Sequence, residues 1–276
     1  MADLNKPASA RFYPGEEGGP RWYLWEGGFF AIGQAGGEVP SHAHHAIQIV
    51  LAIEGRMGIR QAGEDWRQAR GAIVRPDVEH SFHGNETAGA MLFVDPESSE
   101  GAWLQAGLTQ PITLVPDSRL EACLAELRKF HERPLEAMEL GDLIRHCVRA
   151  FCAGAPPTRR LDARIAAVLA AIRESDDLRI SLEDAAERVH LSPGRLAHLF
   201  KEELGLPFRR YMLWRKLTRA TVAIGKGRSM AEAAHESDFA DAAHLTRTFY
   251  QMFGIPPSVM MRGEFFEIAS PFAAPA

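Results

Sequence analysis

Two hydrophobic patterns follow one another along the chain. Between residues 22 and 94, short apolar or β-favouring runs are separated by turns that contain glycine. The runs lie at residues 22–25, 29–32, 46–53, 57–60, 72–74 and 90–94. Short strands at regular spacing with glycine turns are typical of an all-β barrel or sandwich. This part of the sequence therefore predicts an N-terminal β-barrel.

After residue 116, the apolar positions recur at the three- and four-residue spacing of a helix. The spacing predicts two amphipathic helices after the barrel, at about 117–132 and 135–152. The stretch Ala-Gly-Ala-Pro-Pro-Thr that follows predicts a short stiff linker at 153–160. From residue 161 to residue 266, almost every segment fits a helix. We therefore expect an α+β chain, with a barrel domain at 1–152 and an all-α domain at 161–276.

The all-α part contains an internal repeat. Residues 199–207 match residues 248–256 at phenylalanine, glycine, proline and the apolar positions between them. Each unit also has a capping box that opens one helix and a further capping residue that opens the next. These residues are Ser181, Asp184 and Ser192 in the first unit, and Ser229, Glu232 and Asp241 in the second. The order helix, turn, helix is thus predicted twice, with one connecting helix from residue 208 to about 224.

One side of the second helix in each unit carries cationic or imidazole side chains between small residues. In the first unit these are Arg195, His198 and Lys201, and in the second they are His244 and Arg247. Small residues near a helix start allow close approach to DNA, and Arg or His can then hydrogen-bond base edges in the major groove. The pattern favours two groove-reading helices. A small helical bundle with no nucleic-acid partner is the alternative.

The charge distribution agrees with a polyanionic partner for the second half. The whole chain has a net charge of −5, but residues 1–155 carry 14 Lys and Arg against 21 Asp and Glu, whereas residues 156–276 carry 17 against 15. Seven cations lie between Arg209 and Arg228 with no acid among them. Like charges without a counter-charge repel one another, so this segment suggests nucleic acid nearby. A solvated helix face is the alternative interpretation.

The two units, their order and the basic connecting helix resemble the AraC/XylS family of bacterial transcription regulators. The resemblance rests on Ala186, Leu191-Ser192, Leu196, Phe200-Lys201, Gly205, Phe208 and Tyr211, and on Ala234, Phe239, Asp241, Leu245, Phe249, Phe253-Gly254 and Pro257. It implies a double helix-turn-helix. Two positions depart from the family pattern: Asp238 stands where glycine is usual, and Met260-Met261 stands where Tyr-Arg is usual. An aspartate there makes the turn costlier unless it accepts a left-handed backbone.

The resemblance also implies roles, by position. Base reading is expected from Arg195, His198, His244 and Arg247, and phosphate contact from Lys201, Arg215 and Arg219. An arginine fork suits guanine, so Arg247 is expected to read a base directly. Phosphate contacts would orient the protein on the duplex without specifying sequence.

The histidines of the N-terminal half resemble the two motifs of the cupin superfamily. His42-x-His44 is followed by Gln48 and Gly55, and further on by Gly71, Pro76 and His80. Alternate residues of a strand face one side, so His42 and His44 are expected to point into the barrel together. We expect His42, His44, Gln48 and His80 to line an effector pocket. A divalent metal at His42, His44 and His80 is the alternative, although Gln48 replaces the usual acid ligand.

The remaining chemistry of the sequence is sparse. There is no nucleophile elbow and no glycine-rich phosphate loop, so we expect no enzymatic activity. Cys123, Cys147 and Cys152 lack metal-type spacing and are expected to be reduced packing residues, while His45 and His83 are expected at the surface or rim. No run is long enough to span a membrane, and the first residues do not form a signal peptide, so the cytosol is the expected compartment.

These features together predict a sequence-specific DNA-binding transcription regulator with a cupin-like sensor. Its expected partners are double-stranded DNA, a small-molecule effector, a second copy of the chain paired through the helices at 117–132 and 135–152, and RNA polymerase if it is an activator. Two alternatives stay open. One is a metal-dependent cupin enzyme with an accessory DNA-binding domain, and the other is a non-specific DNA-coating protein.

Overall fold

The structure, a computed structural model, describes residues 11–13, 19–25, 28–132, 137–152, 161–175 and 177–267. These residues form two compact units. The first contains the described residues up to 152 together with 225–227 and 246–267, and the second contains 161–224 and 228–245. The expected linker at 153–160 lies outside the described residues.

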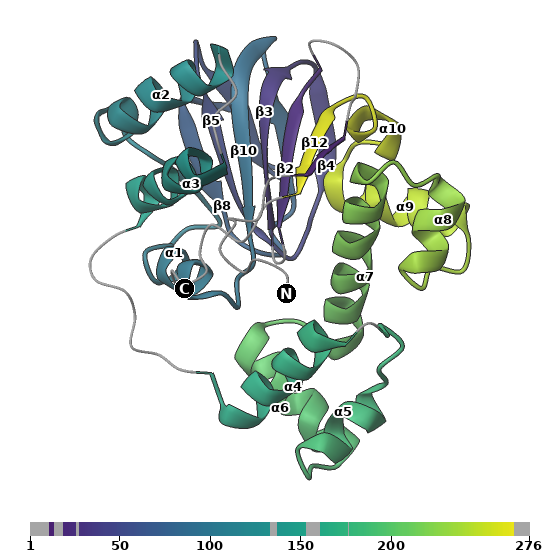
Figure 1. The fold of residues 1–276 in the computed structure, drawn as a ribbon. Helices are drawn as coiled ribbons and strands as arrows, with labels where there is room; N and C mark the ends of the chain where they lie inside the picture. Colours follow the sequence, from purple (N-terminus) through teal and green to yellow (C-terminus); the bar gives the residue numbers. More distant parts are fainter. Residues whose placement is uncertain are drawn as a thin grey trace, which may run out of the picture. The chain divides into compact units, whose positions relative to one another are not determined.

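Two sheets form the frame of the first unit (Figure 1). The larger has the order β1-β12-β2-β3-β10-β5-β8-β11 and the smaller has the order β4-β9-β6-β7. The strands of the larger sheet are β1 (Arg11–Tyr13), β2 (Arg21–Trp25), β3 (Gly28–Ala35), β5 (Ile47–Ala52), β8 (Gly71–Val74), β10 (Thr87–Val94), β11 (Ile112–Leu114) and β12 (Glu264–Glu267). Those of the smaller are β4 (Glu38–His42), β6 (Met57–Gln61), β7 (Arg67–Ala69) and β9 (His80–His83). All six expected strands are present.

Strand β12 corrects the expectation that the chain is helical as far as residue 266. It pairs in parallel with β2 and antiparallel with β1, and in Figure 1 it lies, in yellow, beside the purple β2. The ring of Phe266 stacks on Tyr23 at 4.6 Å, and that of Phe265 on Trp22 at 6.3 Å. These aromatic contacts are made with residues far away in the sequence, so no local periodicity could indicate them.

Up to residue 152, the described part of the first unit contains the helices α1 (Ser99–Ala106), α2 (Asp117–Glu132) and α3 (Ala137–Phe151). In Figure 1, α2 and α3 lie against the larger sheet. Leu120, Leu124 and Leu127 of α2 are fully buried in one core with strand residues such as Ile49 and Leu92. The apolar faces of α2 and α3 are therefore covered within the unit itself.

Arg21 of β2 fixes the end of α2. Its Nη2 donates to the carbonyl oxygens of Phe130 and His131, at 2.7 and 3.0 Å, which are among the carbonyls that a helix end leaves without internal partners. The expectation for the cysteines also holds: Cys123, Cys147 and Cys152 are buried free thiols, with 3.3 Å between Sγ of Cys123 and Sγ of Cys147.

The helical part has the predicted order. Its helices are α4 (Ala163–Glu174), α5 (Leu182–Arg188), α6 (Pro193–Leu204), α7 (Phe208–Gly225), α8 (Met230–Glu236), α9 (Ala242–Phe253) and α10 (Pro257–Met260). Both capping boxes are formed, at Ser181 with Asp184 and at Ser229 with Glu232. Helix α7 is the predicted connecting helix. Among the described residues, no helix combines the length and the apolar character needed to cross a bilayer.

Candidate functional site

The turns of both helix-turn-helix units use a left-handed residue. His190 has φ +54° in the first turn and Asp238 has φ +56° in the second. Aspartate and histidine accept this conformation more readily than most residues with a side chain. Two cations support Asp238: Lys216 Nζ donates to its carbonyl oxygen at 3.2 Å, and Arg179 Nε lies 3.2 Å from Oδ1. The departure from the family glycine is therefore accommodated.

Helix α6 presents the first set of predicted DNA-contacting residues. Ser192 caps the helix by accepting from the backbone N–H of Arg195 at 3.3 Å. The side chains of Arg195, His198 and Lys201 are exposed, while Leu196 and Phe200, on the opposite side, are fully buried. The cap and the buried face together fix the orientation of the exposed face, as a groove-reading helix requires.

Helix α9 presents the second set. Asp241 Oδ1 accepts from the backbone N–H of His244 at 2.6 Å and so caps the helix start. Arg247 is exposed, whereas His244 is only half-exposed and its ring packs edge-on to Phe239 at 5.2 Å. Arg247 can therefore extend away from the helix, while His244 is held close to it.

A cleft of about 1130 Å³ in the second compact unit, residues 161–224 and 228–245, brings some of these residues together. Lys201 and His244 both line it, together with Arg179, Arg209 and Arg210. Arg209 and Arg210 are exposed at the start of α7, whereas Arg215 and Arg219, further along that helix, are only half-exposed. Arg209 and Arg210 belong to the basic segment, and their exposure adds them to the candidates for phosphate contact.

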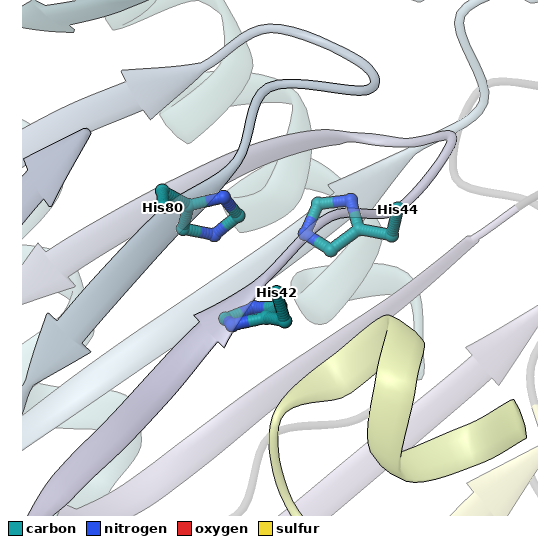
Figure 2. A group of neighbouring side chains, drawn as sticks. All are labelled: His42, His44 and His80. Atoms are coloured by element: carbon teal, nitrogen blue, oxygen red, sulfur yellow. The ribbon is translucent and has the colours of Figure 1, made fainter. Parts of the chain in front are cut away.

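Three histidines meet in the first unit (Figure 2). His42 is the last residue of β4, His80 is the first residue of β9, and His44 lies in the turn between β4 and β5. Their ligand atoms lie within 4.8 Å of one another, and all three side chains are buried. The expected convergence is present, but the strand alternation from which it was inferred is wrong because β4 ends at His42.

Backbone carbonyls orient all three rings. The Nδ1 atoms of His42, His44 and His80 lie 2.9, 3.1 and 2.9 Å from the carbonyl oxygens of Pro40, Ala46 and Val78. A carbonyl oxygen can only accept, so Nδ1 carries the proton in each neutral ring and Nε2 keeps its lone pair. Metal-binding histidines generally make such a contact through the ring nitrogen that does not bind the metal, because it fixes the tautomer and the ring orientation.

The three imidazoles are neutral near pH 7. Burial lowers the pKa of His42, and burial together with the neighbouring histidines lowers the pKa of His44 well below its usual value. Burial and the charge of His42 lower the pKa of His80 to about 3. Neutral imidazoles are the form that binds metal ions.

Gln48 completes the cluster and creates a hydrogen-bonding conflict. Its Oε1 lies 3.0 Å from Nε2 of His44 and 2.8 Å from Nε2 of His80, yet each of these rings also faces a carbonyl at Nδ1. A neutral imidazole has one N–H and cannot donate at both nitrogens. One solution is that the Gln48 amide is rotated, so that its NH₂ group donates to Nε2 of His44 and Nε2 of His80. The other is that a cation binds both Nε2 atoms and the amide oxygen. The donor set therefore suits a divalent ion.

The end of α9 lies against this cluster. The ring of Phe253 is 6.4 Å from that of His44 and 5.8 Å from that of Phe93. Gly254 has φ +69°, and a Cβ added there would come 2.8 Å from Nδ1 of His42. The pale yellow ribbon beside the histidines in Figure 2 belongs to this C-terminal segment. No pattern in the sequence indicated this contact.

His45 is a buried ion-pairing residue, and the expectation that it lies at the surface or rim is wrong. Its Nδ1 and Nε2 lie 2.9 Å from Oδ2 of Asp77 and 2.9 Å from Oε1 of Glu97, and its side chain is 3% exposed. Burial lowers its pKa, but the hydrogen bonds and charges of the two carboxylates outweigh burial and raise the pKa to about 9. His45 is therefore a cation that joins three loops.

Comparisons with known proteins give a family for part of the chain. Residues 185–263 match a helix-turn-helix domain family. The transcriptional activator RhrA of Rhizobium meliloti (strain 1021) is 33% identical over 85 residues, which are 30% of this chain and 27% of the activator. This chain therefore matches only about a quarter of the length of that relative.

Solved structures share the fold across both parts of the chain. ToxT from Vibrio cholerae matches with a TM-score of 0.56 at 10% identity, over 86% of this chain and 99% of that chain. Unsaturated fatty acid bound wild-type ToxT from strain SCE256 matches with a TM-score of 0.50 at 10% identity, over 95% and 97%. These likenesses concern the fold, a sheet-rich region followed by a helical region. The family match and the similar activator bear out the helix-turn-helix domain that the resemblance implied, at residues 185–263.

Proposed function

We propose that the protein is a sequence-specific DNA-binding transcription regulator of the AraC/XylS type that responds to a small-molecule effector. The observation that carries the proposal is the pair of capped helices, α6 and α9, whose exposed faces carry cationic side chains over fixed apolar faces. Such helices, each preceded by a tight turn and a shorter helix, read DNA in the major groove.

The DNA contacts divide by chemistry. Arg195, His198, His244 and Arg247 would read base edges, and Lys201, Arg215 and Arg219 would contact phosphates. The exposed Arg209 and Arg210 are further candidates for phosphate contact, because they line one cleft with Lys201 and His244. Phosphate contacts make affinity depend on salt, whereas base contacts make it depend on sequence.

The effector pocket is proposed at the cluster of His42, His44, Gln48 and His80. A divalent cation would be held by Nε2 of the three histidines, with the Gln48 oxygen beside it, because all three Nε2 lone pairs remain after Nδ1 donates to the backbone. When bound, the ion would supply positive charge to a buried site. That ToxT binds an unsaturated fatty acid supports a small-molecule effector for this fold.

Dimerisation and the other partners belong to the same proposal. A homodimer was expected through the helices that correspond to α2 and α3, but their apolar faces pack in the core of the first unit. A dimer would therefore use the outward faces of these helices. Sedimentation over a range of dilutions, with and without candidate metabolites, tests this part, and a monomer under every condition would remove it. RNA polymerase is a partner if the protein is an activator, and the cytosol is the proposed compartment.

Recovery of DNA sites tests the proposed function. Fragments of the host chromosome are incubated with the purified full chain, and the bound fraction is sequenced. We expect a few sites to be strongly enriched and to share a base pattern. Even recovery of all fragments would instead indicate the non-specific DNA-coating alternative, and no recovery at all would contradict DNA binding.

The three-histidine cluster favours one second candidate, a metal-dependent cupin enzyme with an accessory DNA-binding domain. Metal analysis of the purified chain and of His44→Ala separates the two. Stoichiometric metal that is lost in His44→Ala, together with turnover of a small substrate, would favour the enzyme. Purified protein that recovers its sites after treatment with a chelator would favour the regulator.

A further inference from the structure

An apolar cavity of about 190 Å³ lies in the first unit, beside the three-histidine cluster. Strands β2, β3 and β10 place Trp22, Ala31 and Met91 next to one another in register, and all three residues line the cavity. Gly33 and Gly89, the next register pair on the same face of the sheet, also line it. The small Ala31 between the two large residues leaves space for the cavity, whereas the space above Gly33 is filled by Pro20.

The opposite wall comes from the smaller sheet and from the C-terminal segment. Met57 and Phe82 contribute from β6 and β9, and Ile255 and Val259 contribute from the turn after α9 and from α10. Met91 connects the cavity to the histidine cluster, because its Sδ accepts a hydrogen bond from Gln48 Nε2 at 3.5 Å. The cavity is therefore a compartment adjacent to the proposed effector pocket, with one wall formed by the end of the second helix-turn-helix unit.

The chemistry of the lining limits what can bind. None of the lining residues carries a charged side chain. Trp22 is 5% exposed, and its indole N–H has no hydrogen-bond partner among the described residues. This N–H lies against Gly263, which does not line the cavity, so Trp22 contributes apolar ring surface to the wall. A cavity of about 150 Å³ with apolar walls is enough to hold benzene, so this one accepts a molecule with about one ring.

We propose that this cavity binds a small, uncharged, largely apolar molecule, and that the bound molecule contacts both the barrel and the α9–α10 segment. An anion would lose its hydration without gaining a cationic partner in the lining. Only the role of this molecule as the effector rests on the proposed function. The cavity and its ligand class stand on the geometry alone.

Fluorine NMR with two matched probes tests the ligand class. The probes are 4-fluoroacetophenone, which is neutral, and 4-fluorobenzoate, which has the same ring and a carboxylate. Each is titrated with the full chain in EDTA, so that a metal at the histidines cannot bind the carboxylate. We expect saturable binding of the ketone, with a rise in the melting temperature of the protein, and no saturable binding of the benzoate. Benzoate binding as tight as ketone binding, or no saturable ketone binding, would overturn the proposal.

Two variants locate the binding site. Ala31→Leu fills the cavity between Trp22 and Met91 and should abolish ketone binding, whereas Ala62→Leu, on an exposed turn, should leave it unchanged. Val259→Ala removes apolar contact from the C-terminal wall and should weaken ketone binding on the order of tenfold. Circular dichroism establishes that each variant folds. If Ala31→Leu does not fold, Val259→Ala still decides, and unchanged ketone affinity in either folded variant would contradict the assigned site.

The effect on DNA binding is measured separately. We expect saturating 4-fluoroacetophenone to change the affinity of the full chain for a recovered DNA site, because the ligand contacts the segment that follows α9. Unchanged affinity with saturated ketone would overturn the role as effector site and leave the cavity assignment intact. A chain that binds the ketone but recovers no DNA sites would contradict the proposed function instead.

Discussion

Phe253, the last residue of α9, packs its ring 6.4 Å from the ring of His44. The helix that carries Arg247 at its exposed face therefore ends on the three-histidine cluster of the barrel unit. A change in the cluster reaches α9 through one layer of side chains. In the proposed function, this contact would link effector binding to DNA reading in a single chain.

Gly254 tests this packing, and Gly205 is its matched control. Each ends the second helix of a helix-turn-helix unit, with φ +69° at Gly254 and +81° at Gly205. A Cβ would meet other residues only at Gly254. Gly205→Ala should lower the free energy of unfolding by about 1–2 kcal/mol, the cost of a side chain in the left-handed region. Gly254→Ala should cost about 1–3 kcal/mol more, because its Cβ would overlap Val39 and His42. Urea unfolding measures both, and equal losses would show that the segment does not dock there.

Asp238 should tolerate glycine but not valine. A β-branched residue at φ +56° is strained, so Asp238→Val should be about 1–2 kcal/mol less stable than Asp238→Gly. Ala240→Val, at an exposed neighbour, is the control and should stay within about 0.5 kcal/mol of the parent chain. The urea concentrations at the unfolding midpoint of the parent chain and of the three variants provide the comparison. If the two Asp238 variants were equally stable, the left-handed turn would not be present.

His45 should make stability depend on pH. Its pKa is raised from 6.5 to about 9, so the folded chain binds the proton more tightly than the unfolded chain does. The resulting stabilisation is complete below pH 6.5 and is lost as the pH rises through about 9, and it is on the order of 3 kcal/mol. Burial opposes ionisation of Glu97, but hydrogen bonding with Asp95 and His45 lowers its pKa, so its contribution is lost only in acid.

His45→Gln provides the measurement. The melting temperature of the parent chain should exceed that of His45→Gln by the largest margin near pH 6, and the margin should shrink toward pH 10. Both proteins are treated with EDTA, so that the histidine cluster is in the same state in both. A margin that stays constant from pH 6 to pH 10 would contradict a buried imidazolium between Asp77 and Glu97.

Local signals made the helical part predictable. Capping boxes such as Ser181 with Asp184 act within one turn of helix, and the apolar spacing of α2 reports burial on one side of that helix. The positions of α5 to α9 and the charge of the connecting helix follow from such patterns. The roles of individual DNA-contacting side chains remain predictions, because they depend on a duplex.

Contacts between distant segments were not predictable. Strand β12 reads locally as a short apolar run after Gly263, and only pairing with β2 makes it a strand. His44 joins His42 through a turn rather than along a strand, and the charge of His45 depends on two carboxylates from other loops. The contact of Phe253 with the histidine cluster is likewise a product of packing, which the helical period of α9 does not encode.

Base-by-base binding to a recovered DNA site tests the central claim, that α6 and α9 read sequence. The affinities of the parent chain, Arg247→Ala and Lys201→Ala are measured for that site and for each single-base change in it, at two salt concentrations. Arg247→Ala should lose about 1–3 kcal/mol on the parent site and lose discrimination at one base pair. Lys201→Ala should weaken all sites alike and reduce the salt dependence by about one phosphate contact. If Arg247→Ala weakened binding to every DNA equally and kept the parent preference, base reading by α9 would be contradicted.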